Sequence, residues 1–313
     1  MRYIFIINPA AGKGKIQKDI YDKIKACFPK REENCAVYFT EFKGEAVNIA
    51  KKEAQKGGEI KIFACGGEGT VFEVLNGIKS FENASLGVVP CGSANDFLKF
   101  FKSSAPFSDL AAQKKGKSVK IDAIKANDFY CLNGCSIGMD AVVARDMQLY
   151  KRLPLVSGPL AYNLAIIKTF LGKIGISAKI SLDGEKPFFS NCLFAVAANA
   201  PFYGGGYMAA PYADPFDGLL DFTLVEKISK LKIPKFLSKY KKGKHAQFDY
   251  CTLNTCRTME FSSEKPVPVN LDGEISEISK MKFEIVPKAV KFILPEGVET
   301  ENVNKKLNVF AFT

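Results

Sequence analysis

Apolar and polar residues follow two alternating rhythms along the first 122 positions. Short runs rich in isoleucine, valine and phenylalanine are typical of buried strands, and they fall at residues 3–7, 35–39, 60–64 and 86–89. Between these runs, apolar residues recur at helical spacing over residues 16–28, 45–55 and 71–78. Because alternation of this kind is typical of a parallel sheet flanked by helices, we expect an α/β N-terminal domain.

The rhythm changes beyond about residue 124 to strand-like segments joined by turn signals. Three dipeptides, Asp183-Gly184, Asp217-Gly218 and Asp272-Gly273, favour tight hairpins. Helical patterns interrupt these segments at residues 140–153, 160–171 and 229–242. We therefore predict a mainly antiparallel β-sandwich C-terminal domain over residues 125–295, and an N-terminal domain of residues 1–124 completed by residues 296–313.

Three glycine-bearing stretches follow predicted strands of the N-terminal domain. They read NPAAG at residues 8–12, GGEGT at residues 66–70 and GSAND at residues 92–96. Ligands of parallel sheets bind at the carboxyl ends of the strands, so the three stretches converge on one crevice. Glycine lets main-chain N–H groups approach an anion, and a helix start adds the positive end of its dipole. The pattern predicts a nucleotide phosphate site.

Known phosphate motifs do not explain these stretches. Neither G-x-x-x-x-G-K-[ST] nor G-x-G-x-x-G occurs in the first half of the chain, which excludes a P-loop and a dinucleotide fingerprint there. GGEGT alone fits a tight strand-to-helix turn with a solvated Glu68 equally well. Three such stretches at strand ends of one domain favour the shared site.

The net charge limits the classes of partner that the chain is expected to bind. The chain of 313 residues carries 44 basic and 33 acidic residues, a net charge of +11, with a pI near 9.1. This surplus favours polyanions such as nucleotides, nucleic acid or an anionic membrane. Basic residues are not interleaved with aromatic ones, so we expect no nucleic-acid partner. Four lysines, Lys239, Lys241, Lys242 and Lys244, suit either headgroup docking or a solvated face.

Cysteine usage and apolar run lengths indicate the compartment. The nine cysteines contain no C-x-x-C pair, which argues against a disulfide framework and a zinc site. The first apolar run is too short for a signal peptide, and no uncharged apolar stretch reaches the roughly 18 residues of a spanning helix. We expect a cytoplasmic protein with peripheral membrane association.

The roles of an apolar stretch and of the single histidine allow more than one interpretation. The apolar stretch over residues 153–171 has basic flanks and suits either a lip that admits acyl chains or buried packing, and we expect burial. His245 is the only histidine, and nothing near it suggests a nucleophile elbow. We interpret it as part of the basic surface.

Together with strings in the second half, these motifs resemble the diacylglycerol kinase catalytic superfamily, specifically soluble bacterial lipid kinases related to sphingosine kinases. The resemblance covers nearly the whole chain. It rests on INPAAGKGK at residues 7–15, on Thr40 with Gly44 and Ala46, on GGEGT for the family's GGDGT, and on GSANDF for its GTxNDF. Further matches are NGCSIGMDA at residues 133–141, PYADPFDGLL at residues 211–220 and VNLDGE at residues 269–274.

The resemblance implies a kinase that transfers the γ-phosphate of ATP to the hydroxyl of a membrane lipid, with diacylglycerol as acceptor and phosphatidic acid as product. It makes the N-terminal domain the nucleotide-binding part and the C-terminal domain the lipid-substrate and metal part. The ATP contacts that it implies are Asn8, Pro9, Gly12, Lys13, Thr40, Gly66, Gly67, Glu68, Gly69, Thr70, Ser93, Asn95 and Asp96.

The resemblance also implies a magnesium ion, bound by Asp217 with the backbone carbonyls of Asp214 and Leu219. Transfer of a γ-phosphoryl group needs positioning, neutralisation by Mg²⁺ and a base for the acceptor hydroxyl. Among the catalytic carboxylates Glu274 is our candidate base, with Asp272 second and Glu68 the third. Expected partners are ATP, the lipid and an anionic membrane surface, and a homodimer stays open.

Two features of the sequence keep alternatives open. Residues 182–185 repeat the letters LDGE of residues 271–274, and we interpret this copy as a hairpin turn between residues 180 and 188. Glu68 replaces the usual aspartate, and a displacement of about 1 Å can cost on the order of 100-fold in rate. An NAD kinase, which also carries a GG-acid-GT loop, and a catalytically weakened lipid- or nucleotide-binding regulator are therefore the alternatives. The GSANDF and late LDGE strings favour the lipid branch by resemblance.

Overall fold

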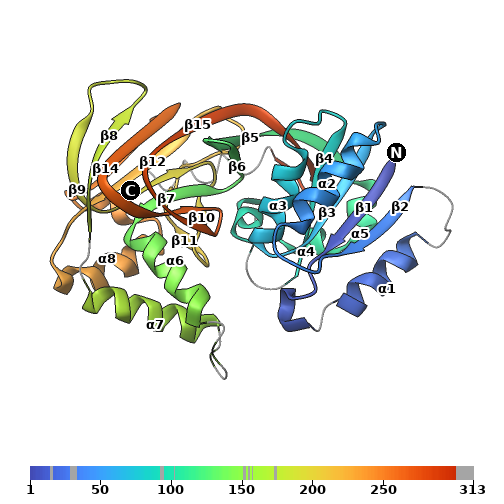
Figure 1. Cartoon of the computed structure of the whole chain (residues 1–313), viewed down its shortest axis with the longest axis horizontal. Coiled ribbons are helices and arrows are strands. Elements are labelled where there is room, and N and C mark those ends of the chain that lie inside the picture. Colours follow the sequence, from blue (N-terminus) through green and yellow to red (C-terminus); the bar gives the residue numbers. More distant parts are fainter. Residues whose placement is uncertain are drawn as a thin grey trace. The chain divides into compact units, whose positions relative to one another are not determined.

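Two strands, β5 (Lys117–Ala126) and β15 (Glu274–Leu294), connect the two structural units of the chain (Figure 1). The first unit comprises Met1–Ala123 and the chain from Pro287 onward, and the second comprises Ile124–Val286. The computed structural model describes residues 1–14, 17–28, 34–91, 95–101, 103–150, 153, 156, 158–172 and 175–300.

The chain returns to the first unit at Pro287, earlier than the predicted residue 296. Strand β15 is uninterrupted and crosses the boundary between the two units. Lys288 on this strand has a φ of 56°, and its N–H donates to Asp122 Oδ1 at 2.7 Å. The buried carboxylate thus stabilises an irregular backbone position that no local sequence pattern marks. Most of the predicted returning segment, residues 301–313, lies outside the described residues.

The first unit contains a parallel sheet in the order β2-β1-β3-β4, and β15 pairs with β4. Its strands are β1 (Arg2–Ile7), β2 (Cys35–Phe39), β3 (Ile60–Gly66) and β4 (Ala84–Pro90). Ile7 pairs with both Phe39 and Cys65, and Gly66 pairs with Pro90. The carboxyl ends of all four strands are therefore neighbours at one edge.

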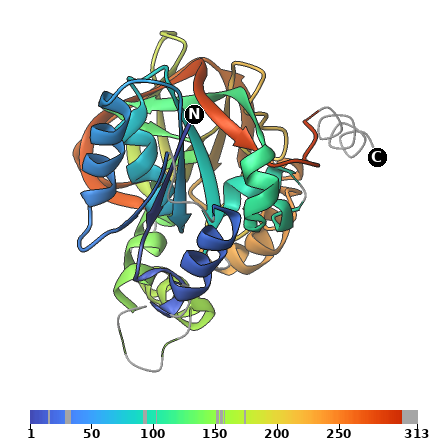
Figure 2. The ribbon, with the colours of Figure 1, turned by 90° about the vertical axis from the view of Figure 1, so that its right-hand side faces the viewer.

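Helices cover both faces of this sheet. They are α1 (Gln17–Cys27), α2 (Glu45–Gln55), α3 (Glu68–Ile78), α4 (Ala105–Ser108) and α5 (Leu110–Lys115), with short 3₁₀ turns at Ala11–Gly14 and Asp96–Phe101. Helices α2 and α3 lie on one face, and α1 and α5 lie on the other (Figures 1 and 2). Alternate residues of β1, Phe5 and Ile7, pack with Ile20 and Ile24 of α1, as expected for a strand buried on both faces.

The Thr-x-x-x-Gly-x-Ala string has a structural explanation. Gly44 precedes α2 with a φ of 91°, which favours glycine. The N–H groups of Gly44 and Ala46 donate to the two carboxylate oxygens of Glu73 on α3, at 2.8 and 3.2 Å. Glu73 therefore caps the amino-terminal end of α2 and fixes it to α3, where the negative charge also suits the helix dipole.

The second unit is built from antiparallel strands. They are β6 (Phe129–Cys131), β7 (Gly134–Gly138), β8 (Ile176–Leu182), β9 (Phe188–Ala198), β12 (Leu220–Glu226), β13 (Cys251–Cys256), β14 (Thr258–Leu271) and most of β15, with a small hairpin of β10 (Phe202–Tyr203) and β11 (Tyr207–Met208). Strands β9 and β14 each pair with β8 along one half and with β7 along the other. These two shared strands fold the sheet onto itself.

Helices occupy the predicted insertions of the second unit. They are α6 (Met139–Tyr150), α7 (Gly158–Leu171) and α8 (Ile233–Tyr240), with 3₁₀ turns at Lys230–Lys232 and His245–Gln247. The expected burial of the apolar stretch is wrong for Leu153, Leu160 and Ile167, which are exposed by 50%, 44% and 55%. Among the described helices, none has the length and apolar character needed to cross a bilayer.

Two of the three predicted hairpin turns are present. Asp183 and Asp272 have φ values of 51° and 48°, and each precedes a glycine with positive φ, as a type I′ turn requires. Ile180 pairs with Phe188 across the first turn, so the early LDGE copy is a hairpin, as predicted. The prediction is wrong for Asp217-Gly218, because the following strand β12 pairs with β9 and β13 rather than with the preceding segment.

His245 is buried, so its assignment to the basic surface is wrong. Its exposed fraction is 0%, its ring lies 4.8 Å from that of Tyr240, and neither ring nitrogen forms a hydrogen bond with the described residues. Gly243, with a φ of +67°, turns the chain inward after α8. This φ favours glycine, and a Cβ at that position would also displace the Met208 side chain, whose Sδ would lie 2.4 Å away.

Acidification is expected to weaken the contribution of His245 to the stability of the fold. Burial lowers the pKa of His245 to about 4, whereas unfolded histidine titrates near about 6.5. Between these values the unfolded state binds more protons at this residue, so its contribution to the free energy of unfolding falls by up to about 3 kcal/mol as the pH drops from about 6.5 to about 4. Burial raises the pKa of Asp140, Asp221 and Asp272, which act in the opposite direction, so the measurement is a difference between two proteins. In urea unfolding, the free energy of unfolding of the native protein should fall relative to that of His245→Gln over this range. Equal pH slopes for both proteins would contradict the prediction.

Candidate functional site

The predicted phosphate loops of the first unit are tied together by hydrogen bonds at the carboxyl edge of the sheet. Asn8, directly after β1, donates from Nδ2 to Thr70 Oγ1 at 3.2 Å, and its Oδ1 accepts from the Ala10 N–H at 2.9 Å. Thr40, directly after β2, donates its N–H to the Ile7 carbonyl at 3.0 Å. The loops after β1, β2 and β3 therefore form one connected surface.

The GGEGT string is the junction between β3 and α3. Strand β3 ends at Gly66, and α3 begins at Glu68, earlier than the helical spacing predicted. A Cβ on Gly66 would lie 2.3 Å from Thr70 Oγ1 and 2.6 Å from Thr70 Cβ, so only glycine fits. Gly67 is the N-cap and has no side chain with which to cap the helix. The start of α3 thus offers main-chain N–H groups and a positive dipole end to an anion.

The third glycine-bearing stretch meets the same junction. Asn95 Nδ2 donates to the Gly66 carbonyl at 3.2 Å, and the Asp96 N–H donates to Glu68 Oε1 at 3.1 Å. Asp96 is buried and forms an ion pair with Lys99. Glu68, which replaces the usual aspartate, therefore accepts a main-chain hydrogen bond from the start of the Asp96–Phe101 turn.

Most of the predicted ATP contacts lie in these loops of the first unit. The structure places there Asn8, Pro9, Gly12, Thr40, Gly66, Gly67, Glu68, Gly69, Thr70, Asn95 and Asp96. Ser93 and the side chain of Lys13 lie outside the described residues. The predicted metal and remaining catalytic residues, Asp214, Asp217, Leu219, Asp272 and Glu274, belong to the second unit.

The late LDGE turn joins β14 to β15 and is fixed by Asp272. Its carboxylate accepts the N–H groups of Leu132, Asn133 and Gly134 at 2.5, 3.1 and 2.9 Å. Burial raises the pKa of Asp272 to about 6, while these three donors act in the opposite direction. Both carboxylate oxygens are occupied by main-chain donors, which makes Asp272 an anchor for the turn. Glu274, two residues later, begins β15.

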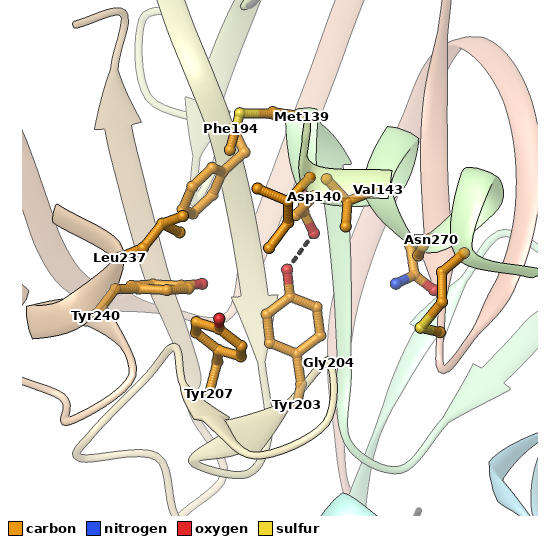
Figure 3. Close-up of a pocket in the computed structure, with 13 residues that line it drawn as sticks. Met139, Asp140, Val143, Phe194, Tyr203, Gly204, Tyr207, Leu237, Tyr240 and Asn270 are labelled. Carbon is orange, nitrogen blue, oxygen red and sulfur yellow. Dashed lines mark hydrogen bonds between the residues drawn. The ribbon is translucent and has the colours of Figure 1, made fainter. Parts of the chain in front are cut away.

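An apolar pocket of the second unit reaches this turn through Asn270. Asn270 lines the pocket, and its Oδ1 accepts the Gly273 N–H at 2.7 Å, so the same side chain contacts the cavity and the LDGE turn. Val143 of α6, Phe194 of β9 and Leu237 of α8 form apolar walls (Figure 3). The cavity and the turn that carries Glu274 are therefore adjacent.

Polar groups gather at one place in this pocket. Tyr203 donates its hydroxyl hydrogen bond to Asp140 Oδ2, and the hydroxyls of Tyr207 and Tyr240 point into the same region (Figure 3). Asp140 Oδ1 and the Tyr240 hydroxyl are buried without a hydrogen-bond partner among the described residues. Burial raises the pKa of Asp140 to about 6 although the Tyr203 hydrogen bond opposes it. The pocket thus offers an acceptor and a donor to an otherwise apolar ligand.

The predicted metal segment is a compact loop before β12. Asp214 Oδ1 accepts the Phe216 N–H at 3.1 Å, and Asp217 Oδ1 accepts the Leu219 N–H at 2.9 Å. The Asp217 N–H also donates to the Asp214 carbonyl at 3.3 Å. The donors of this loop are carboxylate and carbonyl oxygens, the type that Mg²⁺ prefers, so the residues fit this ion.

Asp221 on β12 adds negative charge to the loop. Burial, Asp217 and Asp214 together raise the pKa of the Asp221 carboxyl to about 7. Three carboxylates that repel one another form a place where a cation would be stabilised. Within the described part of the chain, no cluster of three or more histidine, cysteine, aspartate or glutamate side chains is arranged to hold a metal by itself. A metal here would need the backbone carbonyls as well.

Comparison with known proteins identifies the family. The model of the diacylglycerol kinase catalytic domain matches residues 2–126, and that of the YegS C-terminal NAD kinase beta sandwich-like domain matches residues 133–294. The chain is 30% identical over 312 residues to the Bacillus subtilis (strain 168) protein named "Putative lipid kinase YtlR", covering 92% of this chain and 98% of that protein. The chain belongs to the diacylglycerol kinase and YegS family of lipid kinases.

Further relatives agree with this assignment. The "Diacylglycerol kinase" of Staphylococcus carnosus (strain TM300) is 25% identical, covering 94% of this chain and 95% of its own length. A solved structure titled "putative diacylglycerol kinase", from Bacillus anthracis str. Sterne, shares the fold with a TM-score of 0.74 at 22% identity, over 95% of this chain and 98% of that chain. The resemblance seen in the sequence and the prediction of a kinase are confirmed, as is a β-sandwich-like C-terminal domain.

Sequence reasoning missed several residues of this kinase's second unit. They are Asp140, Tyr203, Tyr207, Tyr240, Asn270 and Asp221. Part of the signal was present in the string YGGGY at residues 203–207, because its three glycines have φ values of 62°, 86° and 98°. This conformation restricts the hairpin to glycine and places a tyrosine on either side of it. A buried Asp221 inside an apolar strand was a second signal.

Proposed function

We propose that this lipid kinase transfers the γ-phosphoryl group of ATP to the free hydroxyl of diacylglycerol, with Mg²⁺, to form phosphatidic acid. The observation that carries the proposal is Asn270, which contacts both the apolar pocket and the turn bearing Glu274. The cavity volume is about 60 Å³, so the pocket would hold only the polar end of a lipid, with its hydroxyl close to a carboxylate base. We further propose that the enzyme works in the cytoplasm, at a membrane surface.

The first unit would bind ATP through the loops at the strand ends. Main-chain N–H groups at the start of α3 suit the phosphates, and Thr70 and Asn8 are held in place by their mutual hydrogen bond. Glu68 is fixed by the Asp96 N–H, and we assign it a supporting catalytic role at the phosphates. Positioning is the main contribution of a protein to phosphoryl transfer, so these rigid contacts support the assignment.

The second unit would supply the acceptor and the base. The acceptor oxygen forms a bond to the γ-phosphorus, the bond from that phosphorus to the bridging oxygen of ADP breaks, and Glu274 takes the hydroxyl proton. Asp272 positions Glu274 through the three main-chain N–H groups that hold the turn. Mg²⁺, held by Asp217 with the carbonyls of Asp214 and Leu219, would supply neutralising positive charge.

The pocket favours a lipid over a dinucleotide. Its walls are aliphatic and aromatic, and Asp140, three tyrosine hydroxyls and Asn270 supply most of its polar groups. An unpartnered acceptor, Asp140 Oδ1, suits a lipid hydroxyl, and the Tyr240 hydroxyl suits an ester carbonyl. The adenosine of NAD would leave several polar groups unpaired against such walls.

An acceptor assay tests the proposal. Labelled ATP with Mg²⁺ is supplied with diacylglycerol, ceramide, a sphingoid base or a polyprenol in mixed micelles, and with NAD in solution. We expect label in phosphatidic acid, and its loss when EDTA removes the metal. Label in NAD alone would instead support an NAD kinase, and label in a different lipid would move the assignment to that acceptor.

A further inference from the structure

A lysine-rich segment carries most of the excess charge of this chain. Residues 227–244 contain eight lysines and no acidic residue. The other 36 basic residues exceed the 33 acidic residues by only three, so the net charge of +11 is concentrated in one short stretch. A surplus confined in this way indicates one basic surface rather than a uniformly basic protein.

These lysines lie on α8, on the 3₁₀ turn before it and in the short segments on either side of the two. Ile233, Phe236 and Tyr240 form the buried face of α8. Six of the eight lysines are exposed: Lys227, Lys232, Lys235, Lys241, Lys242 and Lys244. No ion pair among the described residues involves any of these six. Lys232 and Lys241 lie over the rings of Tyr250 and Tyr207, at 6.0 and 5.9 Å, and remain exposed. The exposed ammonium groups can therefore attract an external anion.

An exposed leucine lies within this surface. Leu231, between Lys230 and Lys232, is 90% exposed, the largest exposure of any large apolar side chain in the described residues. Lys230 Nζ donates to the Gly172 carbonyl just after α7 at 2.8 Å, which places the segment beside the end of α7 (Figure 1). Apolar side chains among lysines are typical of surfaces that bind the interface of an anionic bilayer.

The opposite face of the same helix lines the ligand pocket. Leu237 and Tyr240 of α8 belong to the pocket wall, whereas Lys235 of the same helix and Lys242, just after it, are exposed. A nucleic acid would also attract the lysines but would gain little from an exposed leucine. We propose that the 3₁₀ turn and α8, residues 227–244, form the docking surface for anionic membranes, with Leu231 inserted among the headgroups. This deepens the lipid kinase function proposed above.

Vesicle binding tests the docking surface with the full-length protein. Vesicles of phosphatidylcholine alone are compared with vesicles that also contain phosphatidylglycerol, by co-sedimentation at low and high salt. The native protein should bind the anionic vesicles and dissociate as salt rises. Each lysine near the surface contributes about fivefold in affinity, so Lys235→Gln with Lys242→Gln should lower it about 25-fold. Leu231→Ser should lower it about tenfold.

A matched control removes the same charge elsewhere. Lys51 and Lys52 are exposed on α2, and Lys51→Gln with Lys52→Gln should bind vesicles like the native protein. Equal losses in both double variants would overturn the proposal, as would tighter binding of an oligonucleotide than of the vesicles. Because Leu231 has little packing to lose, Leu231→Ser keeps the test valid even if a lysine variant fails to fold.

Kinase assays separate this proposal from the proposed function. The Lys235→Gln and Lys242→Gln double variant should phosphorylate diacylglycerol in detergent micelles at the native rate and lose activity only on anionic vesicles. Native protein that binds vesicles but phosphorylates no lipid would contradict the function and leave the docking surface standing. Native activity of the double variant on vesicles would overturn the docking surface and leave the function standing.

Discussion

Replacing Glu274 by glutamine is expected to lower kcat by about 100-fold to 10,000-fold, because the variant cannot take the proton of the acceptor hydroxyl. Glutamine keeps the size of the side chain and much of its hydrogen-bonding capacity, and Glu274 lies at the half-exposed start of β15. The fold should therefore survive. The measurement is kcat on micellar diacylglycerol, with the unfolding temperature recorded alongside.

The chain supplies its own control for this prediction. Glu185 ends the other LDGE string, in an exposed hairpin between β8 and β9. Glu185→Gln makes the same chemical change in the same four-letter context and should leave kcat unchanged. Activity of Glu274→Gln within a few-fold of native would show that another group takes the proton. Asp272 is a poor substitute, since its oxygens already accept three main-chain N–H groups.

The fold was largely predictable because the spacing of apolar residues that distinguishes strands from helices can be read over short stretches of sequence. The alternation of strands and helices predicts the parallel pairing seen between β1, β2, β3 and β4. The start of α3 was harder to place, since glycines at 66, 67 and 69 weaken the helical pattern where the helix begins. The late unit boundary was missed because β15 crosses it without a break or a change of composition.

The candidate site also contains residues that the sequence predicted and residues that it did not. Asn8, Gly66 and Thr70 follow from strand-end motifs, which are short and contiguous. The pocket does not, because Asp140, Tyr203, Tyr240 and Asn270 are widely separated along the chain and meet only through the packing of α6, α8, β14 and the β10–β11 hairpin. The prediction that His245 belongs to the basic surface was wrong for a related reason. A basic neighbourhood in sequence suggested exposure, whereas the Gly243 turn buries the ring.

Replacing Gly66 by alanine is expected to lower kcat/KM for ATP by about 100-fold or more. The new Cβ would lie 2.3 Å from Thr70 Oγ1 and 2.6 Å from Thr70 Cβ. Rotation of the threonine side chain moves Oγ1 but not Cβ, so the end of β3 or the first turn of α3 must shift. Displacement by about 1 Å at a phosphate site costs on the order of 100-fold, and overpacking lowers stability by about 1–3 kcal/mol.

A glycine near the far end of α3 separates the effect on ATP binding from the effect on stability. A Cβ on Gly77, in the last turn of α3, would lie 2.5 Å from the Val47 carbonyl oxygen of α2. Gly77→Ala should therefore destabilise the first unit by a similar amount. Because this contact is distant along α3 from the Gly66 turn, the KM for ATP of the folded variant should stay native. If both variants lose ATP affinity equally, the defect comes from general loosening of the unit. If Gly66→Ala keeps the native KM, the junction of β3 and α3 does not hold the phosphates.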